Sequence, residues 1–270
     1  MSPLIEITDP RISDPATILI DVRAGASAHD RYLAGHLPKA IFATLDDDLA
    51  AHPDDPAFGG RHPLPALTHF SETLGRWGIT PESHVVVYDD KNAAMGAARL
   101  WWMLQAIGHT RVQVLNGGLK AATDHGLELS TENYQPVHLA DYPVPEQYSN
   151  TADMEEVSNA VKDDNRVVID VREAQRYLGY TEPLDLVAGH IPGAVNLFYA
   201  ESLSPEGKYL SPQTLAGLYS GTIGNVNPGQ VIIHCGSGVT ACHTLLGMEY
   251  AGIIGAKLYV GSWSEWSRRF

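Results

Sequence analysis

The sequence contains little cysteine: only Cys235 and Cys242 occur among its 270 residues. Two cysteines cannot build a disulfide framework, and so few thiols fit a reducing compartment in which a catalytic thiol survives. No apolar run is long enough to span a bilayer, and the first residues lack the basic start and apolar core of a signal peptide. We therefore expect a cytoplasmic protein without a membrane partner.

Basic residues are also scarce. The chain has 18 Lys and Arg against 32 Asp and Glu, which gives a net charge of −14 and argues against nucleic acid and anionic membranes as partners. An anionic substrate would therefore need local positive groups. The 12 histidines are scattered without metal-site spacing, and neither a dinucleotide fingerprint nor a phosphate-binding loop is present. We expect no metal and no cofactor.

The most informative segment that is present surrounds Cys235. A β-branched run, Val231–His234, leads into Cys235, a Gly-Ser-Gly turn and an apolar, helix-compatible stretch that reaches Tyr250. This order predicts a buried strand, a tight loop and a helix, with a thiol at the carboxyl end of the strand. Backbone N–H groups at a helix N-terminus favour negative charge, so the pattern indicates a nucleophilic thiolate. The amides expected to face the sulfur are those of Gly236, Gly238, Val239 and Thr240. Cys242 lies among apolar residues of the helical stretch and is predicted to be core.

The chain contains an internal repeat of one domain. Four blocks recur in the same order, pairing Ile18–Arg23 with Val167–Arg172, Ala34–Ala40 with Ala188–Ala194, Val85–Asp90 with Val231–Gly236, and Leu115–Leu119 with Tyr259–Trp263. Within each copy, short apolar strands alternate with helical patterns such as Met95–Ile107 and Thr240–Tyr250, which is typical of an α/β fold with a mainly parallel sheet flanked by helices. We predict domains at residues 1–130 and 151–270, joined by a Pro- and Ser-containing linker at 131–150.

The repeat makes a prediction about the first domain. Its central strand is followed by Asp89 at the position where the second copy has Cys235. A carboxylate cannot act as a sulfur nucleophile, so the first domain should be catalytically silent. We expect it to form one wall of a cleft whose other wall carries Cys235.

These blocks resemble the tandem rhodanese sulfurtransferases over nearly the whole chain. The neutral loop Cys235–Thr240 is similar to that of 3-mercaptopyruvate sulfurtransferases, whereas thiosulfate-using relatives typically carry basic residues there; Gly261–Trp266 resembles the C-terminal signature of the family. The resemblance implies that Cys235 takes sulfur from 3-mercaptopyruvate as a persulfide, with release of pyruvate. The sulfur then passes to cyanide or to a thiol, either thioredoxin or a low-molecular-weight thiol.

The resemblance also implies roles for individual residues. Ser237 occupies the serine position of the loop, His62 lies in a segment like the one that carries the histidine of the family, and Asp46 aligns with its carboxylate. This relay would protonate the enolate of pyruvate. Arg176 matches an arginine that binds the carboxylate of the substrate. A second arginine, found in many relatives after the segment matching Thr181–Pro183, is missing here, and Arg61 or Lys91 could replace it.

Three other functions compete with this interpretation. Thiosulfate could be the sulfur donor in the same reaction class. The chain could instead be a persulfide carrier or interaction module that hands sulfur to a partner, although a carrier has no enolate to protonate. A dual-specificity phosphatase of similar fold would need a longer loop closed by an arginine, and this chain has Ala241 there.

Overall fold

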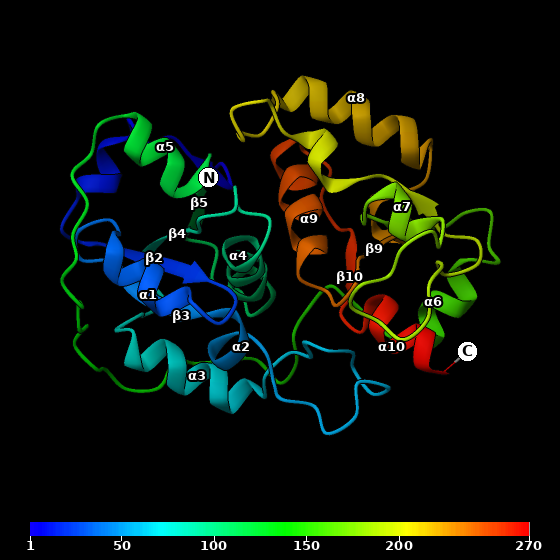
Figure 1. The fold of residues 1–270 in the computed structure, drawn as a ribbon, viewed down its shortest axis with the longest axis horizontal. Coiled ribbons are helices and arrows are strands. Elements are labelled where there is room, and N and C mark those ends of the chain that lie inside the picture. Colours follow the sequence, from blue (N-terminus) through cyan, green and yellow to red (C-terminus); the bar gives the residue numbers. More distant parts are fainter. Residues whose placement is uncertain (270) are drawn as a thin grey trace. The chain divides into compact units, whose positions relative to one another are not determined.

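The computed structural model describes Met1–Arg269 and divides the chain into two compact units. The first contains Met1–Ala51 and Pro65–Ser149, and the second contains His52–Leu64 and the chain from Asn150 onward. Each unit is built on a five-stranded parallel sheet with helices packed around it (Figure 1). The predicted fold class, two tandem α/β domains with parallel sheets, is confirmed.

The first unit has strand order β1-β5-β4-β2-β3. Its strands are β1 Leu4–Ile5, β2 Thr17–Arg23, β3 Ile41–Thr44, β4 His84–Tyr88 and β5 Val112–Leu115. Its helices are α1 Ala28–Ala34, α2 Leu45–Asp48, α3 Leu67–Arg76, α4 Gly96–Ala106 and α5 Gly118–Asp124, with a 3-10 turn, η1, at Pro10–Ser13.

The second unit repeats this arrangement with strand order β6-β10-β9-β7-β8. Its strands are β6 Thr151–Ala152, β7 Val167–Asp170, β8 Val195–Asn196, β9 Val231–His234 and β10 Lys257–Tyr259. Its helices are α6 Met154–Ala160, α7 Ala174–Tyr177, α8 Pro212–Ile223, α9 Thr240–Tyr250 and α10 Ser262–Arg269, with 3-10 turns η2 at Tyr199–Ser202 and η3 at Pro228–Gln230.

The central strands are stabilised by the burial of all their side chains. All five residues of β4 and all four of β9 are buried, as expected for strands of a parallel sheet covered by helices on both faces. Helix α4 packs against β2, β4 and β5, and α9 packs against β9 and β10. The predicted helix at Thr240–Tyr250 is observed with the same bounds, and α4 lies inside the predicted Met95–Ile107.

The two copies share a buried ion pair within the repeated Asp-Val-Arg block, at the carboxyl end of β2 in the first unit and of β7 in the second. In each copy the arginine of this block pairs with the preceding aspartate and donates to a backbone carbonyl of the Ala-Gly-His block. The pairs are Arg23 with Asp21 and Gly35, and Arg172 with Asp170 and Gly189. Because the copy that lacks the cysteine retains the same pair, its main role is to fix the loop after the strand.

Sheet order determines where a site can form. In the second unit, β7 and β9 are neighbours, but β7 leads to β8 on one side and β9 leads to β10 on the other. The chain therefore opens a crevice beyond the carboxyl ends of β7 and β9, the usual ligand position of open α/β sheets. The equivalent crevice of the first unit lies beyond β2 and β4.

Two connecting segments pack in ways that the sequence did not indicate. Residues 131–149, predicted as part of the linker, belong to the first unit, where Tyr142 is buried and its backbone N–H donates to Ser71. His52–Leu64 lies within the first repeat in sequence, yet it belongs to the second unit. No helix within residues 1–269 is both long and apolar enough to cross a membrane.

Candidate active site

Cys235 follows β9 directly and lies at the crevice beside β7. Its residue exposure is 3%. The loop that it opens is anchored by the start of α10: Ser262 Oγ accepts from the Cys235 backbone N–H at 3.2 Å, and the Trp263 N–H donates to the Cys235 carbonyl at 3.1 Å. The Ser264 N–H donates to the Gly236 carbonyl at 2.8 Å. The Gly-Ser-Trp segment thus holds the backbone on both sides of the thiol.

Gly238 is required by the shape of the loop. Its φ is +73°, a left-handed conformation that favours glycine, and an added Cβ would lie 2.5 Å from the carbonyl oxygen of Val260. The chain can therefore turn from β9 into α9, which begins at Thr240 without a side-chain cap. The first N–H groups of a helix have no partner within it, so this turn presents amide donors to an anion. The predicted loop residues Gly236, Gly238 and Val239 are buried, and Thr240 is half-buried.

His62 and Ser237 are brought together. Nδ1 of His62 lies 2.7 Å from Oγ of Ser237, and Ser237 is buried at 6% exposure. Both belong to the second unit, although His62 lies within the first repeat in sequence. A hydroxyl two residues from the nucleophile, bonded to an imidazole, can carry a proton to a group that leaves the sulfur.

The segment that carries His62 is fixed by α10. The Gly59 N–H donates to Glu265 Oε1 at 2.9 Å, and the Arg61 N–H donates to Ser264 Oγ at 3.1 Å. Gly60 has φ +81°, and a Cβ there would clash with the carbonyl oxygen of Gly261. Ser264 thus fixes both the nucleophile loop and the histidine segment, since its N–H holds the first and its Oγ the second.

Arg176 lines the site and is held by a buried carboxylate. Its guanidinium donates to Glu182, with an Nη2–Oε1 distance of 2.6 Å, and the Glu182 side chain is 3% exposed. Nη2 lies 3.5 Å from the position that a Cβ on Gly236 would take. The absence of a side chain at Gly236 therefore lets the guanidinium approach the nucleophile loop.

Asp185 lies close to three arginine side chains beside the nucleophile loop. Its side chain is fully buried and lies 3.0 Å from Arg61, 3.1 Å from Arg268 and 3.7 Å from Arg176. Nη2 of Arg61 lies 3.2 Å from the position of a Cβ on Gly236. Of the two candidates for the missing second arginine, Arg61 lies at the nucleophile loop. Lys91 belongs to the first unit, where its N–H donates to Asp89.

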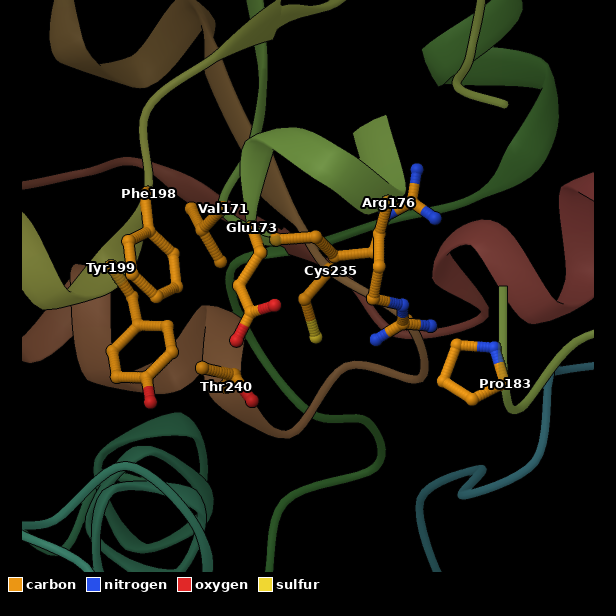
Figure 2. A pocket seen from close by; sticks show the side chains of 10 residues that line it. Val171, Glu173, Arg176, Pro183, Phe198, Tyr199, Cys235 and Thr240 are labelled. Carbon is orange, nitrogen blue, oxygen red and sulfur yellow. The ribbon is translucent and has the colours of Figure 1, made fainter. Parts of the chain in front are cut away.

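A cavity of about 280 Å³ opens over the thiol (Figure 2). It is lined by Val171, Arg172, Glu173, Arg176, Pro183, Phe198, Tyr199, Cys235, Gly236 and Thr240. All of these residues belong to the second unit. The predicted residues Cys235, Gly236, Thr240 and Arg176 thus share one cavity of a size that accepts a small organic acid.

Asp46 is exposed in α2 of the first unit, and its partnership with His62 stays a prediction. Sequence reasoning missed Glu173, Glu182 and Asp185. One signal in the sequence could have indicated the last two. Glu182 and Asp185 lie three residues apart in the segment where an arginine was expected. Among residues 1–269 no cluster of three or more His, Cys, Asp or Glu side chains could hold a metal ion.

Comparison with known proteins identifies the class. The model of the rhodanese-like domain matches residues 6–125 and 153–269. The chain therefore belongs to the rhodanese family and carries two rhodanese-like domains in tandem.

Individual relatives narrow the comparison to sulfurtransferases. The chain is 36% identical over 261 residues to a protein of Pseudomonas aeruginosa named a probable 3-mercaptopyruvate sulfurtransferase, covering 95% of this chain and 91% of that protein. It is 38% identical over 263 residues to a Mycobacterium tuberculosis protein provisionally named thiosulfate sulfurtransferase SseB, covering 94% and 88%. The solved 3-mercaptopyruvate sulfurtransferase of Leishmania major is similar with a TM-score of 0.85 at 29% identity, covering 100% of this chain and 76% of that one.

Proposed function

We propose that the protein is a 3-mercaptopyruvate sulfurtransferase. The Cys235 thiolate attacks the sulfur of the donor, the carbon–sulfur bond breaks with its electrons moving to carbon, and the enolate of pyruvate leaves. Cys235 then carries the sulfur as a persulfide, which a second thiol or cyanide removes. A covalent intermediate divides one difficult transfer into two easier ones.

The Ser237–His62 pair is the observation that carries this proposal. An enolate must take up a proton, and the 2.7 Å contact between Ser237 Oγ and His62 Nδ1 supplies a proton path two residues from the nucleophile. Sulfite, the leaving group from thiosulfate, needs no such proton on carbon. The pair therefore favours 3-mercaptopyruvate over thiosulfate, and it also favours an enzyme over a persulfide carrier.

The charge of the site supports the same donor. The cavity is lined by two arginines, Arg172 and Arg176, and both are paired with buried carboxylates. Little positive charge remains for a dianion such as thiosulfate, whereas the single carboxylate of 3-mercaptopyruvate can share the Arg176 guanidinium. Thiosulfate is the second candidate, because one relative at 38% identity carries that name.

Steady-state sulfur transfer from both donors tests the proposal. We expect wild type to prefer 3-mercaptopyruvate and Cys235→Ser to lose about 1,000-fold or more in kcat/KM with either donor. Cys242→Ser is the matched control, because the other thiol of the chain lies in α9 and should not carry sulfur. A preference for thiosulfate would overturn the donor, and activity without Cys235 would overturn the mechanism.

His62→Asn separates an enzyme from a carrier. We expect kcat with 3-mercaptopyruvate to fall about 100-fold because the enolate loses its proton path, while transfer from thiosulfate changes little. Equal losses with both donors would show that His62 only shapes the loop. We further propose that Asp46 is the carboxylate partner of His62, so Asp46→Asn should reproduce part of this donor-selective loss.

The setting of the reaction is also proposed. Both cysteines are free thiols, which supports a reducing compartment such as the cytoplasm. The acceptor is a thiol in this proposal, either a small one or that of thioredoxin. Mass analysis of Cys235 before and after each thiol is added would show whether that thiol removes the sulfur.

A further inference from the structure

The cavity over Cys235 has two unlike walls. Arg176 lies on one side of the thiol and Glu173 on the other, with Phe198 and Tyr199 beyond Glu173 (Figure 2). One wall therefore suits a carboxylate, and the other combines a carboxylate with aromatic rings. The sulfur reacts between them.

The positive charges around the cavity are already balanced. Four arginines and three carboxylates form one network of ion pairs: Arg61, Arg172, Arg176 and Arg268 with Asp170, Glu182 and Asp185. All three carboxylate side chains are 3% exposed or less, so bulk water screens their charges only weakly. Glu173 supplies the fourth negative charge. With Glu173 included, the four arginines and four carboxylates around the cavity sum to no net charge.

Glu173 is available for a ligand. It stands at the N-cap position of α7, yet its side chain makes no capping hydrogen bond. It is exposed, and within residues 1–269 its carboxylate is not part of an ion pair. Figure 2 shows this carboxylate directed into the space beside the Cys235 sulfur. A carboxylate kept unpaired in an otherwise paired network indicates a charged group on something that enters the cavity.

The aromatic rings beside Glu173 indicate that the charged group of the entering molecule is a cation. Phe198 and Tyr199 are half-buried, meet edge to face at 4.8 Å and line the same wall. The faces of aromatic rings attract cations, and an ammonium group beside a carboxylate gains from both contacts. The donor of the proposed function has no cation. The wall must therefore serve the molecule that enters second, after the donor has left its sulfur.

We propose that Glu173, with Phe198 and Tyr199, selects as sulfur acceptor a small thiol that carries a protonated amine. The inference rests on the proposed function, since it names the acceptor of the same site. The thiolate of the acceptor attacks the outer sulfur of the Cys235 persulfide, and the S–S bond breaks with its electrons returning to Cys235. The acceptor leaves as its own persulfide, its ammonium group having been held by Glu173. In the first step Glu173 repels the donor carboxylate and directs it to Arg176.

Three acceptors of similar size and different charge test this assignment. Cysteamine is cationic, 2-mercaptoethanol neutral and 3-mercaptopropionate anionic. Each would be mixed with the Cys235 persulfide of wild type and of Glu173→Gln, and the transfer rate followed in single turnovers. We expect Glu173→Gln to lower the rate for cysteamine about 3- to 10-fold relative to 2-mercaptoethanol, as for a partly exposed charge pair, and to raise it for 3-mercaptopropionate. Because the intrinsic reactivity of each thiol is the same with both enzymes, it cancels when the ratio measured with the variant is divided by the ratio measured with wild type.

Glu155→Gln is the matched control. Glu155 is an exposed carboxylate of α6 in the same unit, outside the cavity, so its loss changes the net charge equally without changing the ratios. The inference is overturned if Glu173→Gln leaves the three ratios unchanged, or if Glu155→Gln shifts them by the same factor. If 3-mercaptopyruvate fails to load Cys235, the proposed donor is wrong, but the acceptor series can still be measured after loading with thiosulfate.

Discussion

The ends of β4 and β9 occupy the same place in the two sheets, but what lies in the loop after each strand differs. After β4, the Asp89 carboxylate accepts four backbone N–H groups, from Lys91 and Ala93 at 2.8 Å and from Met95 and Ala97 at 3.3 Å. Its own side chain fills the amide cradle. After β9, the chain places a thiol and leaves a cavity above it. The loop of the first copy is thus filled by a side chain of the protein, whereas the loop of the second lines a cavity over its thiol.

Loop length explains part of the difference. Helix α4 begins seven residues after Asp89, whereas α9 begins five residues after Cys235. The longer loop places Asn92 and Ala93 at positive φ, a strained conformation for alanine, and wraps around the carboxylate. The shorter loop needs positive φ only at Gly238. The two loops are thus a closed and an open form of the same strand-to-helix connection. The closed loop surrounds a carboxylate of the protein, and the open loop lies beside the thiol.

The largest expected effect comes from moving the thiol between the copies. In a Cys235→Ser background, Asp89→Cys should restore no sulfur transfer, leaving activity about 1,000-fold or more below wild type. The position equivalent to Ser237 is Lys91, and the loop encloses the side chain at position 89 completely. Donor turnover and mass analysis of the introduced thiol would both be measured. Turnover in this double variant would show that the first unit can transfer sulfur once a thiol stands at position 89.

Ser237→Ala should give the next largest effect. We expect kcat with 3-mercaptopyruvate to fall about 100-fold, since the His62 ring loses its hydroxyl partner, while persulfide formation from thiosulfate persists. Ser220→Ala, at an exposed position of α8, is the control for loss of a hydroxyl. Equal losses with the two donors would mean that Ser237 holds the loop and does not carry a proton.

Much of this arrangement could be predicted from local sequence. The run Val231–His234 and the glycine at 238 predict the strand and the turn. The hydrophobicity of a side chain and the tolerance of glycine for positive φ are properties of single residues and can be read from the sequence. The repeat indicated Asp89 as the counterpart of Cys235. Glu173 and Asp185 could not be placed, because their roles depend on the path of the irregular segment 178–190. Residues 52–64 join the second unit through the close fit of Gly60 against Gly261, which no periodicity reveals.

The fourth residue of the helix after each loop is a buried polar side chain, Arg99 in α4 and His243 in α9. Neither ring nitrogen of His243 has a hydrogen-bond partner among residues 1–269, and the ring stacks on Tyr209 at 4.5 Å. Burial lowers the pKa of His243 to about 3. The unfolded chain therefore binds a proton below its ordinary pKa of 6.5 that the folded chain does not, and stability falls as the pH falls.

His243→Phe should remove this loss. The phenyl ring can keep the stacking on Tyr209. The free energy of unfolding of the variant minus that of wild type should rise by about 2 kcal/mol as the pH falls from about 6.5 to 5. Urea unfolding at several pH values measures the difference. His69→Gln, at an exposed position of α3, should track wild type. A constant difference between His243→Phe and wild type would show that the imidazole is charged or hydrated in the folded protein.

Asp89 should give a smaller effect of the opposite sign. Burial raises its pKa to about 6 from 3.8, even though four backbone N–H groups lower it. The folded chain therefore binds a proton in this window that the unfolded chain does not. The stability contributed by Asp89 is complete below about pH 4 and is lost as the pH rises through 6.

Replacing Asp89 by asparagine removes this titration. The free energy of unfolding of wild type minus that of Asp89→Asn should fall by about 1 kcal/mol between about pH 5 and pH 6, whatever the constant offset from altered hydrogen bonds. Asp124→Asn, in an exposed pair with Lys120, should show no such change. A difference that instead rises with pH would mean that the amide cradle of the first unit stabilises the charged carboxylate. The two loops would then share a strong preference for an anion and differ only in whether the chain or a substrate supplies it.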